Sequence, residues 1–210
     1  MEIAYFIGAV LAAYLIGSLS FAVIVSKAMG LSDPRSYGSK NPGATNVLRS
    51  GSKAAAVATL LLDALKGWVP MVLVQTFGKD HGLGDATLAA VGLAAFLGHL
   101  YPVFFRFQGG KGVATAAGVL FGVHWILGLA VMLTWALVAY AKRYSSLASL
   151  VCALAAPLYY LLGDRTAWYV DRWMLTALIV MGALLVWRHR LNITKLLEGK
   201  ESKLGSRAKT

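Results

Sequence analysis

The sequence predicts an all-α polytopic membrane protein: one domain over residues 1–210, seven transmembrane helices, the N-terminus outside and the C-terminus cytoplasmic. The first observation is composition, because 58% of the 210 residues are hydrophobic and the mean hydropathy is +0.66, well above the usual apolar share of soluble domains. The second is a series of uncharged runs that approach the roughly 20 residues needed to cross a bilayer. The third is that Lys and Arg concentrate in alternate loops, as the positive-inside rule requires.

The chain divides into apolar segments separated by short polar loops. The first segment has Glu2 before it and Lys27 after it. A signal peptide would carry its positive charges first, so this segment is predicted to be an anchored helix with its N-terminus outside. The segments span residues 3–26, 54–78, 86–105, 112–141, 145–163 and 173–187.

The run 112–141 decides the number of crossings. As a single helix it would be about 45 Å long, roughly half as long again as the hydrocarbon core. A break near 122–124 gives two crossings of about 12–17 residues and leaves sixteen Lys and Arg inside against three outside. The positive-inside rule therefore favours seven crossings, with a re-entrant segment or a thinned membrane as the alternative. Gly118 and Gly122, a small-xxx-small pair, are predicted to permit close helix contact, although such pairs are common in Gly- and Ala-rich spans.

The net charge of +11 and the cysteine content restrict the class of protein. In a soluble protein this charge would suggest nucleic acid, but here the positive residues lie in loops on one side of a membrane. The predicted partners are therefore membrane lipid and small anionic molecules, and nucleic acid is not expected. The single cysteine, Cys152, excludes an intramolecular disulfide framework and a cysteine-rich zinc site.

Three polar regions fall on the same predicted cytoplasmic side: 27–53, 106–115 and 188–201. In the second, Gly109, Gly110 and Gly112 surround Lys111 just before an apolar run that begins at Val113. Glycine lets backbone N–H groups approach a ligand, and the N-terminus of the following helix favours an anion. The pattern is not a Walker A loop. The turn therefore indicates a phosphate site, or alternatively a plain turn whose lysine only sets topology.

The first region groups Asn41, Thr45, Asn46 and Arg49 among Gly and Pro residues. Arginine can hold a phosphate with two parallel hydrogen bonds, so we interpret the loop as a binding element, with a solvated linker as the alternative.

Two pairs of polar residues are spaced three apart. Asp63 and Lys66, within the second apolar segment, can form an ion pair that is either structural or functional. His189 and Asn192 share a face if the last helix continues to Leu197, which makes them candidates for phosphate contact.

The three polar regions contain no Ser-His-Asp grouping, carboxylate pair or metal-ligand spacing. Such a site would bind phosphorylated ligands and act mainly by positioning and charge neutralisation. The competing classes are a transporter or channel for a phosphorylated anion and a polybasic membrane anchor without chemistry.

Six motifs in this order resemble the bacterial membrane glycerol-3-phosphate acyltransferases that use acyl phosphate as donor. The resemblance covers nearly the whole chain. The motifs are Gly17-Ser18, the run Gly38 to Arg49, Asp63 with Lys66-Gly67, Gly98-His99 with Pro102-Val103-Phe104, Gly109 to Thr115, and Arg188-His189-Arg190 with Asn192-Ile193.

The resemblance implies an enzyme of phospholipid biosynthesis in the bacterial cytoplasmic (inner) membrane, with seven helices, no metal or other cofactor and a site facing the cytoplasm. It would transfer a fatty acyl group from acyl phosphate to the 1-hydroxyl of glycerol 3-phosphate, giving lysophosphatidic acid and inorganic phosphate. A substrate phosphate, rather than a side chain, would take the hydroxyl proton.

The resemblance and the residue patterns described above together indicate residue roles. We expect catalytic roles for Ser39, Arg49, Lys111, His189 and Asn192. We expect substrate binding by Asn41, Thr45, Asn46, Gly109, Gly110, Gly112 and Ser146, and structural roles for Asp63, Lys66 and Glu201. Two positions depart from the family pattern: Ser20 replaces a frequent proline, which puts a local helix kink in doubt, and Leu191 replaces a frequent acidic residue.

Overall fold

The structure is a computed structural model and describes residues 1–205, so Arg207 and Lys209, counted in the charge of the tail, lie outside the described residues. Apart from one isolated bridge between Asp164 and Trp168, its regular structure is helical, which confirms the predicted all-α class. The helices are α1 (Glu2–Gly17), α2 (Phe21–Ala28), α3 (Ala44–Leu48), α4 (Lys53–Phe77), α5 (Asp85–Leu100), α6 (Val113–Val123), α7 (Trp125–Lys142), α8 (Ser145–Leu162), α9 (Arg172–Arg188) and α10 (Arg190–Leu197), with short 3₁₀ turns η1 (Lys79–His81) and η2 (Val103–Phe105).

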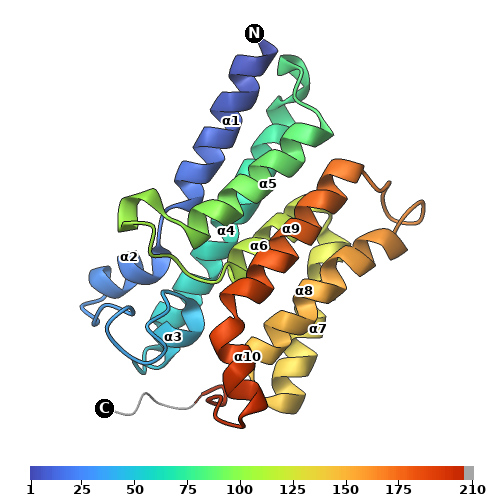
Figure 1. Ribbon diagram of the computed structural model, residues 1–210. Coiled ribbons are helices and arrows are strands. Elements are labelled where there is room, and N and C mark those ends of the chain that lie inside the picture. Colours follow the sequence, from blue (N-terminus) through green and yellow to red (C-terminus); the bar gives the residue numbers. More distant parts are fainter. Residues whose placement is uncertain (206–210) are drawn as a thin grey trace.

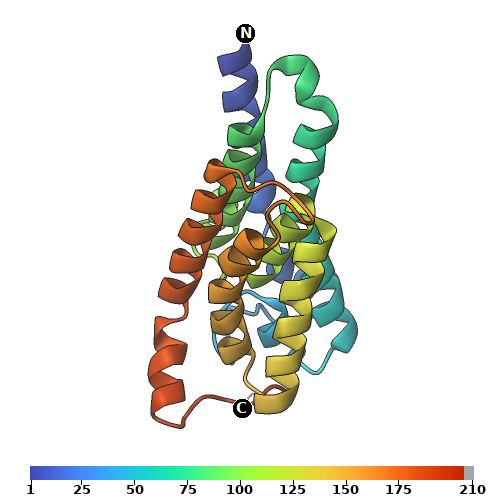
Figure 2. The same cartoon turned by 90° about the vertical axis from the view of Figure 1, so that its right-hand side faces the viewer.

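The helices form an elongated bundle with distinct ends (Figure 1). The N-terminus lies at one end, whereas α2, α3 and α10 gather toward the other, and a view turned by 90° agrees (Figure 2). Large apolar side chains from the middle of the bundle, among them Met71, Phe96 and Leu127, are fully buried. Many other large apolar side chains are exposed on the flanks, as expected where lipid rather than water surrounds a protein.

Within the part of the chain that the structure describes, four helical stretches are long and apolar enough to cross a membrane: α4, Asp85–Phe105, α7 and α8. The pairs α1–α2, bent by 45°, and α9–α10, bent by 57°, raise the number to six if each pair is one span. The apolar helix α6 has 11 residues and is therefore only about 16 Å long.

The predicted break in the run 112–141 is present. His124 is extended, with φ −161° and ψ 135°, and separates α6 from α7. The side chain of Gln75 on α4 donates to the Gly122 carbonyl at 2.8 Å, which satisfies a group at the end of α6. The two helices are unequal, with 11 and 18 residues, because α7 continues to Lys142.

The first apolar segment also breaks, at residues 18–20 between α1 and α2. The serine at position 20, where a proline is frequent in the family, had put a kink in doubt. The chain nevertheless bends by 45° here without a proline. The Lys66 ammonium donates to the Leu19 carbonyl at 2.6 Å and so supplies a partner for the interrupted backbone.

The Gly118 and Gly122 pair packs on α4, which confirms the predicted close helix contact. A Cβ at Gly118 would lie 1.9 Å from the Ala64 carbonyl oxygen, and one at Gly122 would lie 2.5 Å from Met71 Cβ. This contact holds α6 against α4, and the turn that leads into α6 is therefore anchored at its C-terminal end.

Candidate active site

The turn 109–112 lies between η2 and α6, and Val113 begins α6 as predicted. Gly112 has φ +86°, and a Cβ there would lie 2.3 Å from the Phe96 ring, so the position requires glycine. The Gly110 N–H donates to the His99 carbonyl at 3.1 Å. This N–H is therefore used within the protein, which differs from the expectation that it faces a ligand.

Arg188 holds the same turn from the opposite side. Its guanidinium donates to the Gly109 carbonyl at 2.7 Å and to the Gly110 carbonyl at 3.1 Å, and it stacks over the Tyr101 ring. These bonds neutralise carbonyl dipoles that would otherwise repel a nearby anion. From its position beside His189 alone, Arg188 was not assigned a role at the site, because this role depends on a contact between residues 78 positions apart.

Lys111 joins the glycine turn to α10. Its Nζ donates to Asn192 Oδ1 at 2.5 Å. Burial lowers the pKa of Lys111 to about 8, and the Glu201 carboxylate opposes this effect. The neighbouring charges of Arg49, Arg188 and Lys195 lower the pKa further. The site therefore has an excess of positive charge, which an anionic ligand would relieve.

Glu201 connects α10 to α8. One of its carboxylate oxygens accepts a hydrogen bond from Asn192 Nδ2 and another from Ser146 Oγ, each at 2.7 Å. The chain of contacts therefore runs from Lys111 through Asn192 and Glu201 to Ser146. This arrangement fits the predicted structural role of Glu201, since the carboxylate fixes the orientation of the amide that faces Lys111.

His189 is buried at the bend between α9 and α10. The helix does not run straight to Leu197 as the shared face of His189 and Asn192 supposed, because it turns by 57° at this residue. His189 Nδ1 lies 2.8 Å from the Leu185 carbonyl. Because a carbonyl only accepts, Nδ1 carries the hydrogen, and Nε2 of the neutral ring is left as an acceptor.

The first loop is shaped by Asn46, which is buried. Its amide nitrogen donates to the carbonyls of Pro34 at 2.7 Å and Tyr37 at 3.2 Å, and its oxygen accepts from the Ser39 N–H at 3.0 Å. The side chain thus fixes the backbone that presents Ser39. These three bonds occupy both hydrogens of the amide nitrogen and one acceptor position of its oxygen. The expected contact of Asn46 with substrate stays a prediction.

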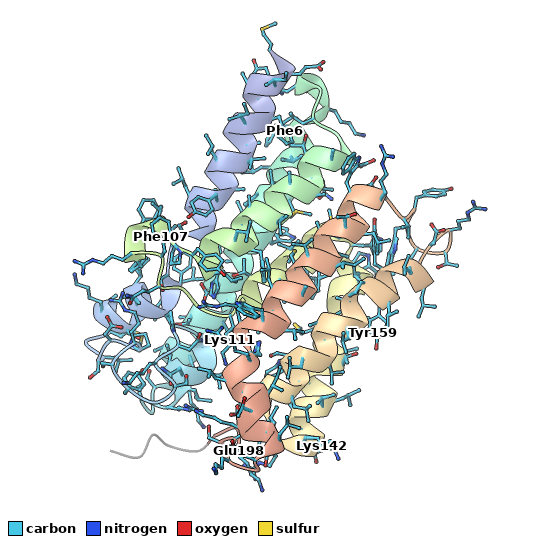
Figure 3. All side chains as sticks on the ribbon, in the orientation of Figure 1. Phe6, Phe107, Lys111, Lys142, Tyr159 and Glu198 are labelled. Atoms are coloured by element: carbon cyan, nitrogen blue, oxygen red, sulfur yellow. The ribbon has the colours of Figure 1, made fainter. Side chains whose placement is uncertain are left out.

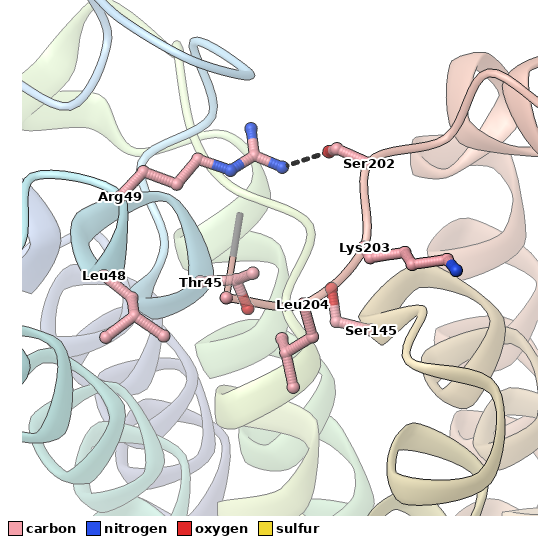
Figure 4. Close-up of a pocket in the computed structure, with 8 residues that line it drawn as sticks. Thr45, Leu48, Arg49, Ser145, Ser202, Lys203 and Leu204 are labelled. Carbon is pink, nitrogen blue, oxygen red and sulfur yellow. Dashed lines mark hydrogen bonds between the residues drawn. The ribbon is translucent and has the colours of Figure 1, made fainter. Parts of the chain in front are cut away.

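Arg49 reaches across to the segment 198–205 that follows α10. Its guanidinium donates to Ser202 Oγ at 2.5 Å (Figure 4). The Leu204 N–H donates to the Arg143 carbonyl at 2.6 Å, which fastens this segment to the turn between α7 and α8. A pocket lies between these parts of the chain, and its lining consists of Thr45, Leu48, Arg49, Ser145, Ser202, Lys203, Leu204 and Gly205.

Ser202, which contacts Arg49, is another residue that the sequence did not indicate, since a serine in a basic tail has no distinguishing spacing.

Asn41 precedes Pro42, whose carbonyl would lie 2.9 Å from a Cβ on Gly110, so the first loop and the glycine turn touch. The predicted pair Asp63–Lys66 is present at 2.8 Å. Within residues 1–205, no group of three or more His, Cys, Asp or Glu side chains is gathered as a metal site requires.

Comparison with known proteins identifies relatives over nearly the whole chain. Residues 7–199 match the family model described as glycerol-3-phosphate acyltransferase. The chain is 61% identical to the glycerol-3-phosphate acyltransferase of Albidiferax ferrireducens, over 97% of this chain and 91% of the relative. It is 62% identical to that of Burkholderia pseudomallei (strain K96243), over 96% of this chain and 97% of the relative.

Two solved structures share the fold. One is PlsY (YgiH), an integral membrane glycerol 3-phosphate acyltransferase, in its glycerol 3-phosphate form, with a TM-score of 0.86, 42% identity and 96% coverage of both chains. The other is its lysophosphatidic acid form, with a TM-score of 0.84, 41% identity and 95% coverage of both chains. The helical bundle, the converging polar contacts and these matches agree that the chain belongs to the glycerol-3-phosphate acyltransferase family of integral membrane enzymes.

Proposed function

We propose that this acyltransferase uses acyl phosphate as its donor and acylates the 1-hydroxyl of glycerol 3-phosphate. The products are lysophosphatidic acid and inorganic phosphate, and the reaction is the first step of bacterial phospholipid synthesis. The observation that carries the proposal is the chain of contacts from Lys111 to Asn192, Glu201 and Ser146, which brings the glycine turn, α10 and α8 together beside Arg49. The solved relatives, described as glycerol 3-phosphate and lysophosphatidic acid forms, support the acceptor and the product.

In the proposed reaction the 1-hydroxyl oxygen attacks the carbonyl carbon of acyl phosphate. The new ester C–O bond forms, the bond from the carbonyl carbon to the phosphate oxygen breaks, and inorganic phosphate leaves. The hydroxyl proton passes to a phosphate oxygen of a substrate. No cofactor or metal takes part, so the protein accelerates the reaction by orientation and by stabilising negative charge.

Lys111 and Arg49 neutralise the two phosphate groups in this proposal. Neutral His189 accepts a hydrogen bond from the glycerol backbone through Nε2, and Asn192 is oriented by Glu201. Ser39 and Asn41 complete the orientation from the first loop, and the acyl chain lies between helices and enters from the lipid. The further residues assigned to substrate binding are Thr45, Asn46, Gly109, Gly110, Gly112 and Ser146, of which Asn46 and Gly110 act through the backbone that they fix.

We further propose that the enzyme crosses the bacterial cytoplasmic membrane seven times, with its N-terminus outside and its site on the cytoplasmic side. The positive-inside count supports this topology, as does the placement of the N-terminus at the end of the bundle away from α10. In a Cys152→Ala background, Ser50→Cys and Thr166→Cys should react with a membrane-impermeant thiol reagent from opposite sides of the membrane. Reaction of both from the same side would contradict the topology.

The decisive assay supplies purified enzyme with palmitoyl phosphate and follows inorganic phosphate. Release should require glycerol 3-phosphate, should match lysophosphatidic acid formation one to one, and should persist in a chelator. Lys111→Met should abolish turnover, whereas Lys142→Met, an exposed lysine at the end of α7, serves as a control and should retain it. Phosphate release without the acceptor, or unchanged turnover in Lys111→Met, would contradict the proposal.

A further inference from the structure

Three buried polar side chains lie behind the glycine turn, within the bundle. Asp63, Lys66 and His99 are 2%, 3% and 7% exposed, respectively. Asp63 and Lys66 belong to α4, and His99 lies near the end of α5, one residue before Leu100. Charged groups in such a place are costly unless they are paired, so their presence calls for a specific role.

The ion pair of Asp63 and Lys66 does not use the full capacity of the carboxylate. Lys66 Nζ lies 2.8 Å from Asp63 Oδ1 and donates to the Leu19 carbonyl. The same Asp63 oxygen lies 3.6 Å from His99 Nδ1. Among the described residues, neither Asp63 Oδ1 nor His99 Nδ1 finds a hydrogen bond of standard geometry. The carboxylate therefore faces the imidazole and favours the tautomer that carries a hydrogen on Nδ1.

The opposite edge of the His99 ring contacts the glycine turn. A Cβ on Gly110 would lie 2.2 Å from His99 Nε2, and one on Gly109 would lie 2.1 Å from the His99 carbonyl oxygen. The Gly110 N–H also donates to that carbonyl. Residue 99 thus meets the turn through both its backbone and its ring. Lys111, which directly follows Gly110 in the chain, is labelled in Figure 3.

We infer that His99, oriented by Asp63, is a positioning residue that sets the place of Lys111 and thereby the binding of glycerol 3-phosphate. The backbone contact alone would permit any side chain at position 99. The ring fills the space between Asp63 on α4 and the glycine turn. The carboxylate, whose Oδ1 lies 3.6 Å from His99 Nδ1, favours one orientation of the ring by electrostatic attraction. A displacement of about 1 Å at a reacting group can cost about 100-fold in rate, so a small shift of the turn should be measurable. This inference rests on the proposed binding role of Lys111.

The test compares His99→Ala, His99→Gln and Asp63→Asn with a matched control. Thr59→Val is that control, because Thr59 is buried on the same helix one turn before Asp63 and its hydroxyl has no hydrogen-bond partner among residues 1–205. Each variant is assayed for kcat and for the KM of each substrate, and the affinity for glycerol 3-phosphate is measured by calorimetry. Thermal unfolding gives the fraction of folded protein.

We expect His99→Ala to raise the KM and the Kd for glycerol 3-phosphate about 10-fold or more, with a smaller change in the KM for acyl phosphate. His99→Gln should recover part of the loss, because its amide reaches toward the same space. Asp63→Asn should change the constants in the same direction, and Thr59→Val should leave them unchanged. If His99→Ala fails to fold, His99→Gln and Asp63→Asn carry the comparison.

Variants that lose thermal stability but keep unchanged kcat, KM and Kd per folded molecule would overturn the inference and leave His99 with a packing role only. The calorimetric experiment contains no acyl donor. If unsubstituted enzyme fails to use acyl phosphate, the proposed donor is wrong, while the binding data still decide the role of His99.

Discussion

The charge on Lys111 offers the sharpest test of how the site works. Burial lowers the pKa of this lysine from 10.5 to about 8. About three quarters of the free enzyme would then carry the ammonium at about pH 7.5, but only about a tenth at about pH 9. If the charged form alone binds the phosphate, kcat/KM for glycerol 3-phosphate should fall about 8-fold over this range. The substrate does not change charge there, since the second pKa of a phosphate monoester is about 6.

The assay measures kcat/KM at saturating acyl phosphate across this pH range in unsubstituted enzyme and in Lys111→Arg. Arginine keeps its charge throughout, so the substitution should remove the alkaline decline even if it lowers the maximum rate. A second measurement does not depend on activity. The rate at which an amine reagent modifies Lys111, read by mass spectrometry, should rise with an apparent pKa near 8.

An alkaline decline that persists unchanged in Lys111→Arg would assign it to another group. A modification rate that follows the ordinary lysine pKa of 10.5 would show that burial does not control this amine.

Three further outcomes are expected. Glu201→Gln keeps the acceptor oxygen but removes the charge that raises the pKa of Lys111, so the alkaline decline should move to lower pH, and no movement would contradict this electrostatic coupling. Asn46→Ala should destabilise the protein by about 2–3 kcal/mol, because buried backbone groups of the first loop lose their partners; thermal unfolding measures this, and an unchanged Tm would refute it. Gly118→Leu should prevent correct folding, because even a Cβ would meet the α4 backbone, whereas Gly8→Leu should be tolerated, since no atom of the described residues lies within 4 Å of a Cβ built there; yield of folded protein distinguishes the two.

The pKa of Lys111 also predicts how stability depends on pH. Because this pKa is lower in the folded protein than in the unfolded chain, burying the charged form costs stability below about pH 8. That cost disappears as the pH rises toward 10.5. Relative to Lys111→Met, the unsubstituted enzyme should therefore gain Tm as the pH is raised from about 8 to about 10, and a relative loss would contradict the sign.

Hydropathy and charge bias are local properties of the chain, so they were sufficient to predict the helical class, the approximate segments and the break near His124. The order of its motifs also identified the family before any geometry was known. The glycine turn, the Asp63–Lys66 pair and the polar face of the last segment were all visible as spacings of a few residues.

Tertiary structure alone decided which groups the site can use. The Gly110 N–H bonds to His99, Arg188 takes the carbonyls of the turn, and Arg49 meets Ser202 across 153 residues. The last segment also bends by 57° between α9 and α10, which the spacing of His189 and Asn192 did not indicate. Local pattern fixes which segments form helices, but a hydrogen bond is a property of atoms brought together by packing, so its partners appear only when the bundle is assembled.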